Sequence, residues 1–112
     1  MIYHVTLASD WKQSEALGRH AISGRGMTLE SEGYLHFSYS HQLPGVLQRY
    51  WARVTEPVVL LTVDPDLLDL PVVAENTSGG TELFPHLYGP LPLAAVVEVR
   101  QLAINADGGA QL

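Results

Sequence analysis

Residues 33–39 read Gly-Tyr-Leu-His-Phe-Ser-Tyr, and they alternate between two kinds of side chain. Leu35 and Phe37 share one face of the extended chain, while the opposite face carries a phenol, an imidazole and a hydroxyl. Alternation with a period of two residues, rich in aromatic groups, is typical of a half-buried β-strand. The segment therefore predicts a strand whose apolar face enters a core and whose polar face lines a ligand cleft.

The composition is that of a folded and acidic domain. Apolar residues make up 46% of the 112 residues, charged residues make up 16%, and the net charge is −6. This length and apolar content predict a single domain with one core. The negative charge argues against non-specific binding to nucleic acid or to anionic lipid. Cysteine does not occur in the sequence, which excludes disulfides and thiolate chemistry.

The N-terminal residues show no basic region followed by an apolar stretch, so we expect no secretory signal. No apolar run of the sequence is long enough to cross a bilayer. We therefore expect a cytoplasmic protein without a membrane partner, present either as a monomer or as a weak homodimer.

Strands and helices alternate along the rest of the chain. Period-two patterns and β-branched runs predict strands at residues 2–7, 33–39, 58–64 and 93–102. Helical spacing predicts helices at residues 10–17, with Asp10 as N-cap, and 41–54, with Ser40 as N-cap. The continuous run of β-branched residues and leucines at Val58–Val63 indicates a strand that is buried on both faces. This mixture of elements predicts an α+β fold.

Three further segments are expected to lack regular structure. Residues 19–32 are polar and rich in glycine, which favours a loop. Residues 82–92 contain three prolines, which disfavour a helix or a central strand, yet their apolar content predicts an ordered, partly buried segment. Residues 103–112 offer little to bury, so we expect a globular domain at residues 1–102 and a flexible C-terminal tail.

Histidines mark two of the predicted strands. His4 shares a strand face with Thr6, as His36 shares one with Ser38. If the two strands are neighbours and these faces lie on one side, both imidazoles line one cleft, and residues 82–92 would close over it. The expected cleft residues are His4, His36, Ser38, Glu82, His86 and Tyr88.

Two other interpretations fit the same residues. The histidines could be polar residues of the sheet, satisfied by hydrogen bonds to the backbone or to tyrosine hydroxyls. Alternatively, three of His4, His36, His86 and Glu82 could bind zinc and leave one position open. No two of these residues show a diagnostic ligand spacing, and Pro85 prevents Glu82 and His86 from sharing a helical turn, so we expect no metal.

Several blocks of the sequence resemble one bacterial family. They are Ile-Tyr-His at residues 2–4, Glu-Ser-Glu-Gly-Tyr-Leu-His-Phe-Ser at 30–38, Pro-Gly at 44–45, and Glu-Leu-Phe-Pro-His-Leu-Tyr-Gly-Pro-Leu-Pro at 82–92. Together they resemble the family called domain of unknown function 952, over nearly all of residues 2–102.

A more distant resemblance links that family to the ADP-ribosyltransferase-like fold. Tyr3-His4 followed by Thr6 is similar to the Tyr-His-Gly-Thr start of its RNA 2′-phosphotransferase branch, and residues 35–38 are similar to its Val-His-Leu-Ser strand. Residues 57–64 resemble its Pro-Val-Val-Leu-x-Val-Asp strand. This resemblance implies a split or strongly bent mixed β-sheet with two or more short helices.

The same resemblance implies a small nucleotide ligand, with NAD as the first candidate. His4 would contact a ribose hydroxyl of NAD, and His36 would lie near its nicotinamide end. We expect His4, Thr6, Ser38, Tyr88 and Arg25 to bind the cofactor, and His36, Glu82 and His86 to be catalytic. If the protein is an enzyme, NAD-dependent transfer or glycohydrolysis is the expected reaction.

A second hypothesis is a non-catalytic binding or interaction module that retains this fold. Val5 stands where the transferase branch has a glycine, and Arg19 and Arg25 are the nearby arginines for an RNA phosphate. No residue aligns convincingly with the transferase glutamate, although Glu82 is a carboxylate late in the chain. These departures favour ligand or protein binding without transferase chemistry.

Overall fold

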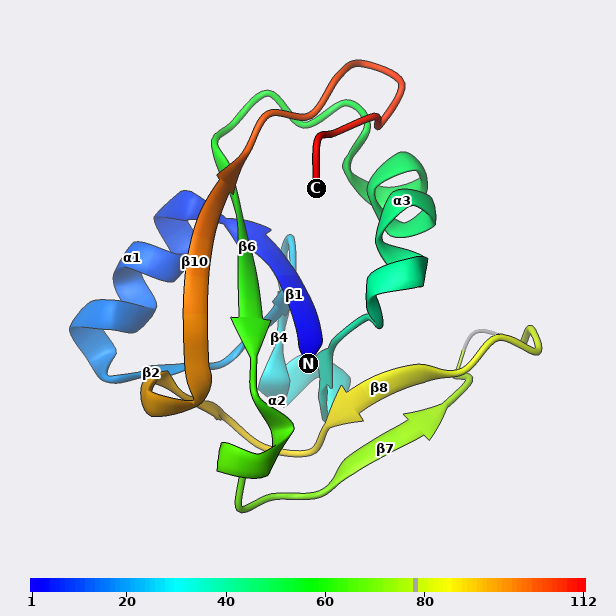
Figure 1. Ribbon diagram of the computed structural model, residues 1–112. Coiled ribbons are helices and arrows are strands. Elements are labelled where there is room, and N and C mark those ends of the chain that lie inside the picture. The colour runs from blue at the N-terminus through cyan, green and yellow to red at the C-terminus, as the bar shows by residue number, and fades with distance from the viewer. Residues whose placement is uncertain (78) are drawn as a thin grey trace.

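A computed structural model describes residues 1–77 and 79–112 (Figure 1). In chain order its helices, short 3-10 or π turns (η) and strands are β1 (Ile2–Leu7), α1 (Ala8–Leu17), β2 (Arg19–His20), β3 (Ile22–Gly24), β4 (Met27–Thr28), α2 (Leu29–Glu32), β5 (Leu35–His36), η1 (Ser40–Gln42), α3 (Leu43–Val46), η2 (Leu47–Trp51), β6 (Val58–Val63), η3 (Pro65–Leu67), β7 (Val72–Glu75), β8 (Phe84–Leu87), β9 (Leu91–Pro92), η4 (Leu93–Ala95) and β10 (Val96–Leu102). None of the helices in this part of the chain is long and apolar enough to cross a membrane.

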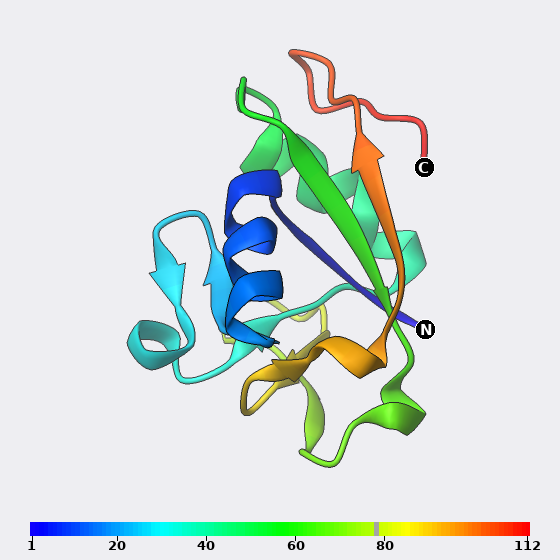
Figure 2. The same cartoon turned by 90° about the vertical axis from the view of Figure 1, so that its left-hand side faces the viewer.

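The main sheet has the strand order β1-β6-β10, with β6 paired antiparallel to both neighbours. Alternate residues of β6 enter two separate core clusters. One cluster contains Trp11 of α1, and the other contains Leu47 and Trp51 of η2. Figures 1 and 2 show α1 and α3 on opposite sides of this sheet. The prediction that Val58–Val63 is buried on both faces is therefore confirmed, as is the α+β class.

A second sheet has the order β5-β8-β7, and its central strand β8 contains a proline. The expectation that residues 82–92 form no central strand is therefore wrong for the four residues of β8. The carbonyl of Pro85 accepts a hydrogen bond from the N–H of Phe37 at 2.9 Å. Proline has no N–H to donate in return, which accounts for the end of the β5 ladder at His36. The strand predicted at residues 33–39 is correspondingly shorter.

The chain that leaves β5 connects the two sheets. Ser38 forms an isolated antiparallel bridge with Tyr3 of β1, and both backbone hydrogen bonds of this bridge are 2.8 Å long. Residues 35–38 thus pair with β8 at one end and with β1 at the other. This change of partner brings the polar face of β5 next to β1.

The segment at residues 19–32 is more regular than its composition indicates. Instead of a loop it forms β2, the hairpin of β3 and β4, and the short helix α2. Gly26 closes the hairpin turn with a φ of 70°, a conformation that glycine adopts without strain. The hydroxyl of Thr28 accepts the N–H of Ser31 at 3.0 Å and so caps α2. Local turn and cap residues explain structure that hydrophobic periodicity does not reveal.

The helix boundaries also differ from the predicted ones. Helix α1 begins at Ala8, so Asp10 lies in its first turn and is not the N-cap. The predicted helix at residues 41–54 is divided into η1, α3 and η2 and ends at Trp51. Ser40 is the first residue of η1 and not a cap.

Residues 103–112 fold back on themselves beyond β10. Ile104 bridges Ala110, and the N–H of Asn105 donates to the carbonyl of Gly109 at 2.7 Å. Gly108 is buried at the tip of this turn against Gln48 of η2. The predicted mobility of this tail in solution stays a prediction.

We expect Gly108→Ala to lower the free energy of unfolding by about 1–3 kcal/mol. Gly108 has a φ of 89°, and a Cβ atom there would lie 2.3 Å from the Cα atom of Gln48. Urea unfolding measures the change, with Gly109→Ala as matched control, because its nearest contact is 3.1 Å from a side-chain oxygen of Asp107. Equal stabilities of the two variants would show that the turn does not dock on η2.

Candidate functional site

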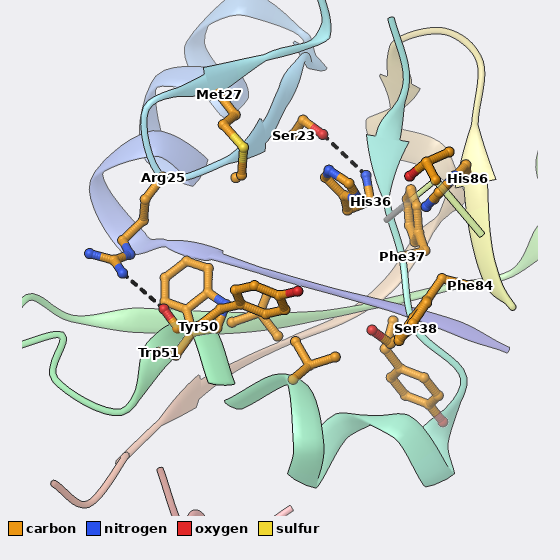
Figure 3. A pocket seen from close by; sticks show the side chains of 15 residues that line it. Ser23, Arg25, Met27, His36, Phe37, Ser38, Tyr50, Trp51, Phe84 and His86 are labelled. Atoms are coloured by element: carbon orange, nitrogen blue, oxygen red, sulfur yellow. Dashed lines mark hydrogen bonds between the residues drawn. The ribbon is translucent and has the colours of Figure 1, made fainter. Parts of the chain in front are cut away.

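A cavity of about 470 Å³ lies between β1, β5 and η2, on the α3 side of the main sheet (Figure 3). Its walls are largely aromatic and include Tyr3, Phe37, Tyr50, Trp51 and Phe84. Its polar lining consists of Ser23, Arg25, His36, Ser38, Thr77 and His86. The cavity therefore combines flat apolar surfaces with a small set of hydrogen-bonding groups.

The pairing of Tyr3 with Ser38 decides which histidines reach this cavity. Residues directly opposite each other in an antiparallel pair point to the same side of the sheet. His36 lies two residues from Ser38 and shares its side, whereas His4 lies next to Tyr3 and points to the opposite side. Consistent with this register, Tyr3, His36 and Ser38 line the cavity.

The single cleft expected for both strand imidazoles is therefore wrong. His4 is 1% exposed and does not line the cavity. Thr6, which shares its strand face, is equally buried, and its hydroxyl has no hydrogen-bond partner among the described residues. The cofactor-binding roles of these two residues stay predictions, but the structure places both side chains on the α1 side of β1.

His4 belongs instead to a buried chain of polar groups. Its Nδ1 donates to the backbone carbonyl of His36 at 2.5 Å, and its Nε2 lies 3.1 Å from Nε2 of His20. Nδ1 of His20 lies 2.6 Å from the hydroxyl of Ser14. Burial lowers the pKa of His4 to about 4 and that of His20 to about 3. Both rings are therefore neutral at neutral pH, as satisfied polar residues of the core would be.

Two other imidazoles meet at one end of the cavity. His36 and His86 are directly paired in the β5–β8 ladder, and their ring centres lie 5.2 Å apart in a T-shaped arrangement. Tyr34 stacks on His86 with a centre distance of 4.2 Å and an interplanar angle of 22°. Burial and the nearby His86 both lower the pKa of His36, so its ring is neutral at neutral pH.

Glu75, at the end of β7, binds the outer side of His86. Its Oε1 lies 3.0 Å from Nδ1 of His86 and also accepts a hydrogen bond from the hydroxyl of Tyr88. These hydrogen bonds, first that of Tyr88 and then that of His86, lower the pKa of Glu75. The bond to Glu75 raises the pKa of Tyr88 to about 12. The carboxylate is therefore ionised, and the phenol keeps its proton.

Arg25 marks another part of the cavity rim, in the turn between β3 and β4. Its guanidinium carbon lies 5.4 Å from the ring centre of Trp51, and its Nη2 donates to the carbonyl of Tyr50 at 2.8 Å (Figure 3). Among the described residues that line the cavity, it alone carries a permanent positive charge. Such a guanidinium is suited to a phosphate or carboxylate group of a ligand.

The remaining predicted site residues lie outside the cavity. Glu82 is exposed, and its carboxylate accepts a hydrogen bond of 3.3 Å from the amide of Gln42. Tyr88 is 41% exposed and does not line the cavity. Of the predicted residues, the structure brings together Arg25, His36, Ser38 and His86. Within the described ranges, no group of three His, Cys, Asp or Glu side chains is arranged to hold a metal ion.

Sequence reasoning missed Glu75, Tyr50 and Trp51. The two aromatic residues fall within the helix predicted at residues 41–54, and both line the cavity. A signal for Glu75 does exist in the sequence. An extended stretch at residues 71–75 precedes the polar, glycine-rich residues 76–80, and a hairpin around them would bring Glu75 near His86.

Comparison with known proteins identifies close structural relatives. The crystal structure of protein CC0527 from Caulobacter crescentus has 30% sequence identity and a TM-score of 0.83, covering 99% of this chain and 93% of that chain. A double mutant of CC0527 gives 29% identity, a TM-score of 0.82 and the same coverage. None of the curated proteins searched matches the chain.

The family comparison bears directly on the resemblance noted in the sequence. The family described as "Protein of unknown function (DUF952)" matches residues 5–99, which include the polar strand β5 and the hairpin of β7 and β8. Since this match spans most of the 112 residues, the chain belongs to the DUF952 family of proteins of unknown function.

Proposed function

We propose that this chain binds a small nucleotide in the cavity, and that NAD is the first ligand to test. The observation that carries the proposal is the lining, in which aromatic walls lie beside one guanidinium and two imidazoles. The volume of about 470 Å³ is within the range of roughly 300–1,000 Å³ that is usual for small-molecule sites.

Each part of the lining suits one part of a nucleotide. Tyr50 and Phe84 offer faces on which a base or nicotinamide ring can stack. Arg25 is placed to pair with a phosphate, and Ser38 and Thr77 offer hydroxyls to a ribose. The resemblance to the ADP-ribosyltransferase-like fold supports NAD over other nucleotides.

The second candidate is a binding module without transferase chemistry. It is favoured by a specific observation: none of the described residues that line the cavity is Asp or Glu. Glu82, the carboxylate expected to act in transfer, lies outside the cavity and is exposed. Release of nicotinamide from NAD by the wild-type protein, lost in His36→Ala, would exclude this candidate.

Trp51 provides a direct measurement of ligand binding because it lines the cavity, whereas the other tryptophan, Trp11, belongs to the core on the α1 side. In a Trp11→Phe background we expect NAD and ADP-ribose to change the fluorescence of Trp51 in a saturable way. Arg25→Gln should weaken ADP-ribose binding by about tenfold, or roughly 1.4 kcal/mol, and leave nicotinamide binding unchanged.

The matched control is Arg53→Gln, which removes the same charge from an exposed residue outside the cavity. It should bind ADP-ribose as the wild type does. Fluorescence that does not respond to NAD or ADP-ribose at millimolar concentration would contradict the proposed function, and an equal loss in both arginine variants would contradict the role of Arg25.

A further inference from the structure

His86 presents one ring nitrogen that no part of the described chain uses. Its side chain is 3% exposed, and its Nδ1 is bonded to Glu75. Nε2 makes no hydrogen bond with any described residue, yet His86 lines the cavity. A ring in the cavity lining that has one nitrogen bonded and the other without a partner among the described residues is available to a ligand.

The bond to Glu75 determines which nitrogen carries the proton. An ionised carboxylate only accepts hydrogen bonds, so Nδ1 of neutral His86 must be the protonated nitrogen. The lone pair is then on Nε2, the nitrogen that bonds to no described residue. Glu75 is held in the ionised form by the Tyr88 and His86 hydrogen bonds, which lower its pKa. This is the arrangement of a base that is oriented by a carboxylate.

The groups packed around the ring fix its position and allow it to accept a proton. Tyr34 covers one ring face, and the edge-on ring of His36 approaches from β5. The titratable groups that face His86 are therefore Glu75 on β7, Tyr88 beyond β8, and Tyr34 and His36 on the β5 side. Among them Glu75 carries a negative charge beside the ring, and neutral His36 carries none.

We propose that His86 is the proton acceptor of this cavity and that Glu75 is its positioning residue. The donor is a ligand hydroxyl or a water molecule held in the cavity. Its O–H bond breaks as the proton moves to Nε2, and the electron pair stays on the oxygen, which becomes a nucleophile. This acid–base role rests on the proposed function only in requiring a ligand in the cavity, and it does not require that ligand to be NAD.

Diethyl pyrocarbonate tests the free lone pair directly. An unprotonated imidazole nitrogen attacks its carbonyl carbon, and the other half of the reagent leaves as carbon dioxide and ethanol. Trypsin separates the relevant histidines, because His4, His20 and His86 fall in residues 1–12, 20–25 and 54–100, each without another histidine. We expect His86 to be modified at least about tenfold faster than His4 and His20, whose nitrogens are bonded within the core.

Glu75→Gln separates a positioning role from simple accessibility. Without the carboxylate the protonated ring is less stable, so the midpoint of the pH–rate profile for His86 should move to lower pH and the plateau rate should fall several-fold. The control is Glu98→Gln, which removes an exposed carboxylate on β10 and should leave both quantities unchanged. Circular dichroism of each variant verifies the fold.

The outcomes distinguish this proposal from nucleotide binding. Fast modification of His86 that ADP-ribose does not slow would contradict the proposed function and leave the Glu75–His86 pair supported. If wild-type His86 is modified no faster than His4 and His20, the proposed roles of His86 and Glu75 are overturned, whatever the fluorescence titrations show. An unchanged pH–rate profile in Glu75→Gln would overturn the role of Glu75.

Discussion

The free energy of unfolding should fall by about 3 kcal/mol when the solution is acidified from about pH 7 to about pH 5. The cause is the buried pair of His4 and His20, which lie in the core with their ring nitrogens 3.1 Å apart. Burial lowers the pKa of His4 from 6.5 to about 4 and that of His20 from 6.5 to about 3. Unfolding returns both imidazoles to water and to their ordinary pKa.

The direction of the effect follows from proton binding in the two states. Between the folded and unfolded pKa values, the unfolded chain binds protons that the folded chain rejects, so stability rises with pH. The stabilisation from the two neutral rings is complete above pH 6.5 and is lost progressively as the pH falls toward about 4. Below about pH 3 it changes no further. His36 acts in the same direction, because its pKa is also lowered.

Urea unfolding at the two pH values measures this loss. The interval lies above the ordinary pKa of Asp and Glu, so carboxylates contribute little to it. His20→Gln removes one titrating ring and should reduce the pH dependence by about half. The matched control His41→Gln removes an exposed histidine and should keep the wild-type dependence. A stability that is constant across this interval would show that the two rings bind protons equally in the folded and unfolded states, and so that burial does not lower their pKa.

The elements found from sequence are those with a strong local pattern. The run Val58–Val63 consists of leucine and β-branched residues, a composition typical of a strand covered on both faces, and β6 is that strand. The alternation in Ile2–Leu7 likewise fixes β1. The short elements between residues 19 and 32 could not be found in this way, since two-residue strands are too short to show a period.

The site was harder to predict because alternation shows which residues share a face but not which faces meet. His4 does share its strand face with Thr6, and His36 shares its face with Ser38. The bridge between Tyr3 and Ser38 then sets them on opposite sides, and a shift of one residue in this register would have joined them. The pairing of Glu75 with His86 depends in the same way on a long-range hairpin.

Leu61→Ala should lower the free energy of unfolding by about 2–5 kcal/mol, and Leu60→Ala should do so to a similar extent. Leu61 is 0% exposed and packs in the cluster of Trp11, whereas Leu60 is 3% exposed and packs in the cluster of Trp51. Each truncation leaves a void that rigid strands cannot fill. Leu67→Ala is the matched control, because Leu67 is 53% exposed and its loss should cost less than about 0.5 kcal/mol.

The two core variants also test whether the faces of β6 are independent. Leu60 shares a cluster with Trp51 of the cavity wall, so Leu60→Ala should alter Trp51 fluorescence and weaken binding in the cavity. Leu61→Ala removes packing on the other face, whose cluster meets the cavity through Phe37, so it should change Trp11 emission and weaken binding less than Leu60→Ala does. If the faces are separate, the two losses of stability add to within about 0.5 kcal/mol in the double variant. A larger coupling, or an equal effect of both variants on Trp51, would mean that the cavity depends on both faces of the sheet.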